Sequence, residues 1–123
     1  MHGRVDDGGY EATLTLTVLG GRGRHVEVEA TIDTGFTGAL SLPPNLVEFL
    51  SLPFVARGAA VLADGSMIET RVYRARVIWH GRERVTRVLT SGGGPLIGMS
   101  LLLGSTLTVV ARPGGSVTVV ETR

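Results

Sequence analysis

The sequence predicts an all-β protein, and three observations support this. Glycine is abundant, with 18 residues in a chain of 123, and charged residues make up only 19%. Several short stretches alternate apolar and polar side chains, as strands with one buried face do. The dipeptide Asp64-Gly65 between two such stretches is typical of a β-hairpin. We therefore expect one domain at residues 10–123, preceded by a flexible, polar, glycine-rich segment at residues 1–9.

The first half of the chain contains the cleanest alternation. Residues 10–18 predict a first strand whose even-numbered side chains face the core. After a glycine-rich turn, residues 24–32 predict a second strand, which leads directly into Asp33-Thr34-Gly35. Residues 38–42 form a short apolar strand. Pro43-Pro44 then opens a helical turn that reaches residue 50, because proline suits the first helical position.

The second half predicts three hairpins and a short helix. Residues 58–63 and 66–73 flank Asp64-Gly65, and residues 74–79 and 82–89 flank His80-Gly81. An apolar strand ends at Leu96-Ile97-Gly98, and a leucine-rich helix follows it up to Gly104. The last hairpin joins residues 106–110 to residues 116–120.

Composition argues against several classes of protein. Cysteine is absent, which removes disulfides and cysteine metal sites and fits the cytoplasm slightly better than an oxidising compartment. We expect neither a signal peptide nor a membrane-spanning segment. His2, His25 and His80 lack the spacing of metal ligands, so no metal or other cofactor is expected. A net charge of +1 argues against a dedicated nucleic-acid binder.

Asp33 is the residue with the strongest functional signal. It leaves the end of a strand and enters a turn, and a carboxylate held on a rigid turn is well placed for acid–base chemistry. The simpler interpretation is a turn residue whose carboxylate accepts hydrogen bonds from nearby amides. The order of the other elements favours the functional interpretation.

In that order, the chain resembles the retroviral-type aspartic proteases (retropepsins) and their single-domain cellular relatives. Asp33-Thr34-Gly35 resembles their catalytic loop, and the hairpin tipped by Asp64-Gly65 has the place of their flap. Leu96-Ile97-Gly98 and the helix after it resemble the family's motif of two hydrophobic residues and a glycine, which supports the site. The resemblance covers residues 12–110. It implies a closed β-barrel of the acid protease fold with one short C-terminal helix.

The resemblance also implies a function, that of an aspartic endopeptidase. Such an enzyme needs two carboxylates that share one proton and activate a water. Only one of the four aspartates lies in an Asp-Thr-Gly, so a working site requires a homodimer with one Asp33 from each subunit. Thr34 is expected to form hydrogen bonds across this dimer, and Gly35 is expected to let the substrate backbone pass close by.

The substrate implied is a peptide or protein segment in extended conformation, over which the hairpin closes. The resemblance places the flap and the subsites for apolar side chains at six positions: Phe36, Leu62, Asp64, Gly65, Met67 and Ile68.

Two departures from the family favour an alternative function. Phe36 stands where the viral enzymes often have alanine, and residues 112–123 extend past their usual terminal strand. Because the family's subunits interleave their termini, this extension bears on how a dimer forms. The alternative is a catalytically inactive dimeric module of the same fold that binds peptides or acts as an adaptor.

Six arginines gather between residues 71 and 87 and raise the question of a nucleic-acid face. They are mixed with Glu69 and Glu83 and lack interleaved aromatic residues. The preferred interpretation is the solvated face of a hairpin, with no nucleic-acid partner.

Overall fold

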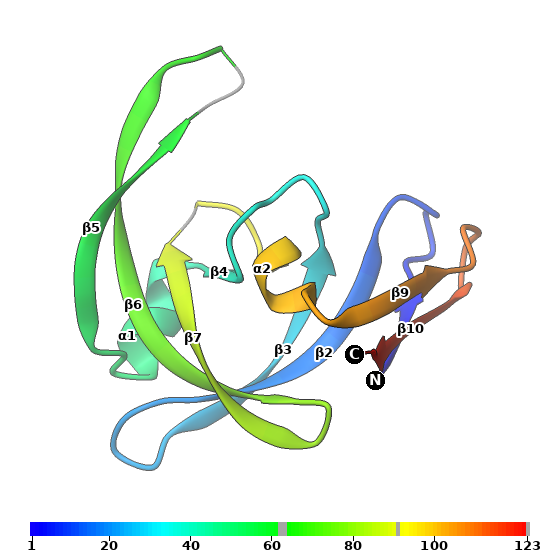
Figure 1. Cartoon of the computed structure of the whole chain (residues 1–123), viewed down its shortest axis with the longest axis horizontal. Coiled ribbons are helices and arrows are strands. Elements are labelled where there is room, and N and C mark those ends of the chain that lie inside the picture. The colour runs from blue at the N-terminus through cyan, green and yellow to red at the C-terminus, as the bar shows by residue number, and fades with distance from the viewer. Residues whose placement is uncertain (62–63, 91, 123) are drawn as a thin grey trace.

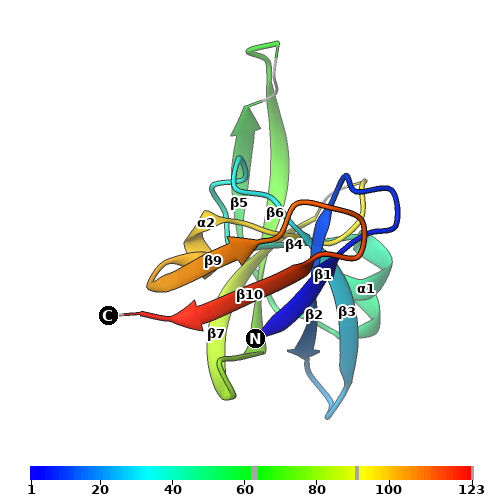
Figure 2. The same ribbon diagram turned by 90° about the vertical axis from the view of Figure 1, so that its right-hand side faces the viewer.

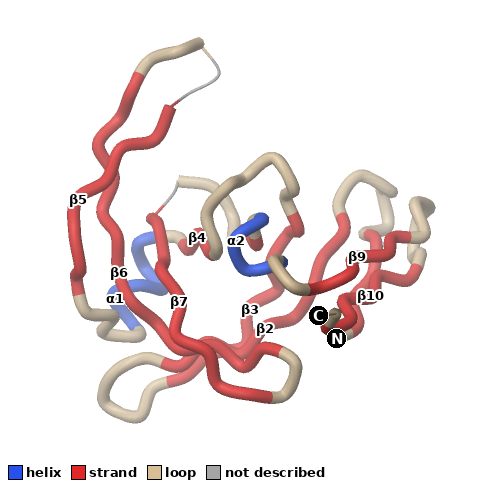
Figure 3. Tube along the Cα trace, viewed as in Figure 1, coloured by secondary structure: helices blue, strands red, loops and turns tan. Residues whose placement is uncertain are grey.

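The computed structural model describes residues 1–61, 64–90 and 92–122, and within these ranges it contains ten strands and two short helices (Figures 1 and 3). The elements are β1 (His2–Val5), β2 (Ala12–Leu19), β3 (His25–Ile32), β4 (Leu40–Leu42), α1 (Pro44–Phe49), β5 (Phe54–Val61), β6 (Met67–Trp79), β7 (Arg82–Thr90), β8 (Leu96–Ile97), α2 (Met99–Leu102), β9 (Ser105–Val109) and β10 (Ser116–Glu121).

Six of these strands close into a barrel. They follow the order β6, β7, β4, β8, β3 and β2, and β2 pairs again with β6 through Val18 and Val77. The β3–β8 and β4–β7 pairs are parallel, and the other pairs in the barrel are antiparallel. Closure leaves these six strands without a free edge. The predicted all-β closed barrel is therefore confirmed, together with the short helix α2 near the C-terminus.

Alternation along β2 correctly predicts which side chains enter the core. Leu14, Leu16 and Val18 are all at most 1% exposed, and they pack with residues from every wall of the barrel. The prediction is wrong for Tyr10, which is 90% exposed. Tyr10 lies before β2, in a loop where its N–H donates to the Asp6 carboxylate, so the strand period does not apply to it.

The hairpin of β5 and β6 is longer than the sequence predicts. The sequence predicts separate strands at residues 66–73 and 74–79, but Met67–Trp79 form one continuous 13-residue strand, β6. Its first half pairs with β5, and its second half pairs with β7 and β2. The hairpin therefore starts within the barrel and projects well beyond it (Figure 1).

The N-terminal segment differs from the flexible stretch predicted at residues 1–9. His2–Val5 form β1, which lies between β2 and β10 (Figure 2). Val5 is only 3% exposed, and the N-terminal amine donates to the Val119 carbonyl at 2.7 Å. The physical reason is that residues 112–123 provide β10, so the backbone of β1 has hydrogen-bonding partners on both edges.

The two ends of the chain thus pair with each other inside one subunit. Beyond the barrel the sheet continues in the order β2, β1, β10 and β9, which makes β9 its last strand. The interleaved termini implied by the resemblance would need β1 and the C-terminal strand to pair with another subunit. Here β10 already occupies one edge of β1.

Candidate active site

Asp33 stands on a turn that its own carboxylate helps to close. Its N–H donates to the Ile97 carbonyl at 2.8 Å, which continues the parallel pairing of β3 with β8. Its Oδ1 accepts from the Gly35 N–H at 2.9 Å, and its carbonyl accepts from the Phe36 N–H at 3.1 Å. These bonds fix the orientation of the carboxylate. The Asp33 carboxylate therefore has a real capping role in its own turn.

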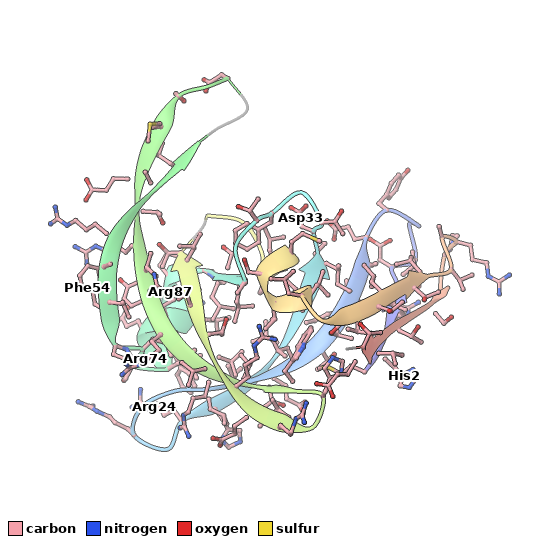
Figure 4. All side chains as sticks on the ribbon, viewed as in Figure 1. His2, Arg24, Asp33, Phe54, Arg74 and Arg87 are labelled. Atoms are coloured by element: carbon pink, nitrogen blue, oxygen red, sulfur yellow. The ribbon has the colours of Figure 1, made fainter. Side chains whose placement is uncertain are left out.

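The Asp33 turn lies at an open end of the barrel, where its side chain reaches solvent (Figure 4). Asp33 is half-buried, whereas Thr34 and Gly35 are exposed. The backbone of this turn is therefore accessible at the surface of the chain.

The second motif lies directly beside the first. Leu96 and Ile97 form β8, which lies between β3 and β4, and Ile97 is fully buried. The Gly98 N–H donates to the Ala39 carbonyl at 2.9 Å. Residues 96–98 therefore hold the Asp33 turn in place through backbone hydrogen bonds.

Gly98 allows a close contact between the Asp33 loop and the start of α2. A Cβ at this position would lie 2.2 Å from the Gly38 carbonyl oxygen and 2.5 Å from the Phe36 ring. The same ring would lie 2.5 Å from a Cβ on Gly38. The half-buried Phe36 ring covers these two glycines and therefore packs the loop in place. The role of Phe36 in lining a subsite stays a prediction.

Hydrogen bonds from α2 complete the support of the loop. The Met99 N–H donates to the Phe36 carbonyl at 2.8 Å, and the Ser100 N–H donates to the Gly38 carbonyl at 3.2 Å. The Ser100 hydroxyl also donates to the Thr37 carbonyl. Sequence reasoning did not find Ser100, and the only signal for it is its position just after Gly98.

The β5–β6 hairpin projects from the same end of the barrel as the Asp33 loop (Figures 1 and 2). Its turn is held by Asp64, whose Oδ1 accepts from the Ser66 N–H at 2.9 Å and from the Ser66 hydroxyl. The bond from the Ser66 hydroxyl, followed by that from its N–H, holds the pKa of Asp64 below its ordinary value of 3.8. Gly65 has a positive φ of 84°, which explains the glycine.

The apolar residues predicted to line the flap are exposed on this hairpin. Met67 is 68% exposed and Ile68 is 47% exposed. The predicted subsite residue Leu62 lies outside the described residues. The hairpin therefore carries exposed apolar side chains, and their role in covering a peptide stays a prediction.

The described ranges hold no group of three or more histidine, aspartate or glutamate side chains that could bind a metal ion. None of the described helices is long and apolar enough to cross a membrane. The cytoplasmic location stays a prediction.

Comparison with solved structures identifies the fold. The chain is similar to the EIAV protease complexed with the inhibitor HBY-793, with a TM-score of 0.60 and 19% sequence identity. The similarity covers 80% of this chain and 93% of that one. The fold is retropepsin-like. No family model matches the sequence, and no curated protein matches it.

Proposed function

We propose that this chain is an aspartic endopeptidase that acts as a homodimer. The observation that carries the proposal is Asp33 at the open end of a retropepsin-like barrel, where the Gly35 N–H binds its carboxylate and the Ile97 carbonyl binds its backbone N–H. The β5–β6 hairpin projects at the same end and can cover a substrate (Figure 1). An aspartate that served only as a turn residue would need neither the projecting hairpin nor a position at the open end of the barrel.

The chemistry requires the Asp33 of each subunit. Two carboxylates a few ångströms apart cannot both ionise, so they share one proton. The ionised carboxylate takes a proton from a water, whose oxygen attacks the peptide carbonyl carbon. The protonated carboxyl group donates its proton to the carbonyl oxygen. Collapse of the tetrahedral intermediate then breaks the C–N bond, and the amine leaves with a proton from the dyad.

The in-chain pairing of β1 and β10 limits how the dimer can form. Val110 and Thr122 donate backbone hydrogen bonds to Ser116 and Gly104, which sets the register of β9 on β10. In this register the N–H and C=O groups of Leu107 point away from β10, toward the free edge of the sheet.

The free edge of β9 is suited to contact with a second subunit. The sequence of β9, Ser105–Val109, carries no charge and no proline, which are the features that usually protect an exposed edge. Leu103 precedes this edge and is 68% exposed, and Met99 on α2 is 42% exposed. We place the dimer contact at the exposed Asp33 turn, these two side chains and the β9 edge.

A peptidase assay with matched variants tests the catalytic role. A mixture of unstructured peptides is incubated with the wild type, with Asp33→Asn and with Asp7→Asn, and cleavage is followed by mass spectrometry. Asp7 is an exposed aspartate paired with Arg4, so its variant controls for the loss of one charge. Asp33→Asn should lower the rate by about 10²–10⁴-fold. Undiminished cleavage by Asp33→Asn would refute the mechanism.

The dimer contact has its own test. Leu103→Glu should shift the protein from dimer to monomer in sedimentation velocity and should remove the activity. Phe49→Glu, on the exposed face of α1, is the control and should leave the dimer intact. If Leu103→Glu remains a dimer with full activity, the contact lies elsewhere.

The alternative function is a protease-fold module that binds peptides without cleaving them. The pairing of β1 with β10 favours it, because that pairing uses strands that would otherwise join two subunits. A pepstatin-type inhibitor distinguishes the two functions, because only a shared-proton dyad holds a transition-state mimic tightly. Tight binding that is lost in Asp33→Asn favours the enzyme, whereas peptide binding without inhibitor binding favours the module.

A further inference from the structure

A groove with a volume of about 630 Å³ lies beside the Asp33 loop, and sequence reasoning did not find it. Gly38 and Ser100 border it at the loop, and Val55 borders it at the start of the β5–β6 hairpin. Its remaining lining comes largely from β6 and β7, on which Figure 4 labels Arg74 and Arg87. The groove therefore connects the supports of the candidate active site with the base of the flap.

One face of the β6–β7 pair supplies this wall. Ala75, Val77 and Val88 are buried in the barrel core. Because side chains alternate along a strand, the residues next to these buried ones on β6 and β7 point outward. The register pairs Val72 with Leu89 and Arg74 with Arg87, so all four line the same outer face. The wall thus combines apolar surface with two guanidinium groups.

The groove arginines differ from their neighbours in their partners. Elsewhere on the hairpins Arg76 pairs with Glu83 at 3.4 Å, Arg82 pairs with Glu121, and Arg71 lies over the Phe54 ring. Within the described ranges, no carboxylate lies within ion-pair distance of Arg74 or Arg87. The six arginines noted in the sequence are therefore not one uniform solvated face.

A third arginine lines the groove and has a structural role. Arg84 donates to the Ser100 and Leu101 carbonyls at 3.3 Å each, which ties β7 to α2. Its positive charge still contributes to the potential within the groove.

The cross-strand pair of Arg74 and Arg87 costs stability in the free protein. Like charges directly opposite on neighbouring strands repel each other, and both arginines carry exposed side chains that line the groove. An anion held between them would relieve this repulsion and would form charge-assisted hydrogen bonds. The pair therefore has the arrangement of a carboxylate receptor.

The rest of the lining favours a peptide over a nucleic acid as the source of the anion. Val55, Val72, Val85 and Leu89 offer apolar contacts, and the described lining has no aromatic ring on which a base could stack. A peptide segment that alternates acidic and apolar side chains matches both parts of the wall.

We propose that this groove binds an acidic side chain of the peptide substrate, at a position outside the scissile bond. The inference rests on the proposed peptidase function, because Gly38 follows Asp33 by five residues in one loop. An extended peptide advances about 3.3 Å per residue, so residues a few positions from the scissile bond can reach the groove. The groove would select substrates with aspartate or glutamate at that position.

Binding is measured separately from cleavage, in the Asp33→Asn background. The probes are fluorescein-labelled apolar decapeptides in which a single glutamate moves through the positions, together with the same set carrying glutamine. Fluorescence anisotropy should show about 10-fold tighter binding for glutamate than for glutamine at one or two positions. This preference should weaken as salt is added.

Charge reversal assigns the preference to the groove. Arg74→Glu with Arg87→Glu should abolish the glutamate preference, and Arg74→Lys with Arg87→Lys should retain part of it. The control, Arg22→Glu with Arg112→Glu, changes the net charge equally at exposed arginines outside the groove and should keep the full preference. Circular dichroism verifies that each variant folds.

Each outcome bears on one of the two proposals. Equal binding of the glutamate and glutamine sets, or a preference that survives charge reversal in the groove, overturns the inference. Tighter binding of a ten-nucleotide oligouridylate than of any glutamate peptide, lost in the same variant, also overturns it in favour of RNA. A groove-dependent glutamate preference in a protein that cleaves no peptide supports the groove and refutes the peptidase.

Discussion

The contact between Gly98 and the Asp33 loop makes a sharp prediction for Gly98→Ala. The backbone at this position has φ −110° and ψ −178°, which any residue adopts, so the effect of alanine is one of space alone. The new Cβ would lie 2.2 Å from the Gly38 oxygen and 2.6 Å from the Phe36 oxygen. Since these are backbone atoms, the whole loop must move by about 1 Å.

The cost follows from packing and hydrogen bonds. Overpacking of this kind costs about 1–3 kcal/mol. Three backbone bonds join the two segments, at 2.8, 2.9 and 3.2 Å, and losing two of them adds about 2 kcal/mol. The free energy of unfolding should fall by about 3–5 kcal/mol. At roughly 3–6 °C per kcal/mol for a chain of this size, Tm should fall by about 10–30 °C.

Urea denaturation and thermal unfolding, followed by circular dichroism, measure this effect. The matched control is Gly93→Ala, because a Cβ on Gly93 meets nothing within 4 Å. It should change the stability by less than about 0.5 kcal/mol. If Gly98→Ala and Gly93→Ala are equally stable, the contact between the loop and α2 is not as close as described.

Three further predictions concern the core, the N-terminal strand and the flap turn. Leu101→Ala should lower the free energy of unfolding by about 2–5 kcal/mol in urea melts, because Leu101 is fully buried; an unchanged stability would contradict this burial. Gly3→Ala places a Cβ 1.9 Å from the Thr13 carbonyl oxygen, so β1 must move away from β2. The backbone amides of β1 should therefore exchange with deuterium much faster than in the wild type. Unchanged exchange would contradict the pairing of β1 with β2. The pKa of Asp64 lies below 3.8, so the stabilisation of the turn by Ser66 is present above that pH and is lost as the pH falls through the lower folded pKa. Ser66→Ala should raise the pKa of Asp64 toward 3.8 in a carbon-13 NMR titration. An unaltered pKa would contradict the contact between Ser66 and Asp64.

Local pattern was sufficient to predict the barrel strands. The alternation at Leu14, Leu16 and Val18 reports a face that is buried along its whole length, so the period-two signal and the structure agree. His80-Gly81 and Gly65 have positive φ values, as their turn signals predict. These features depend on neighbours in the sequence, which is why they could be inferred from it.

The strand β1 could not be predicted in this way. His2-Gly3-Arg4 has no apolar alternation, and one of the two strands that pair with β1, β10, lies more than a hundred positions away. The strand exists because both of its edges find partners. Such long-range pairing leaves no local trace in the sequence.

The candidate site was predictable in its motifs and not in its packing. Asp33-Thr34-Gly35 and residues 96–98 were found from sequence, and the structure brings them together. The contact of Phe36 with Gly98 requires the tertiary arrangement of the loop and α2. Likewise, only the register of β6 and β7 separates the arginines that have acidic partners from Arg74 and Arg87.

The central claim is that two Asp33 carboxylates form one catalytic dyad, and the distance between them in a crystal of the assembled protein tests it most directly. We expect a two-fold dimer in which the two carboxylates lie within hydrogen-bond distance, about 3 Å, and share one proton. A monomer at working concentration, or a dimer in which the two Asp33 side chains lie far apart, would contradict it.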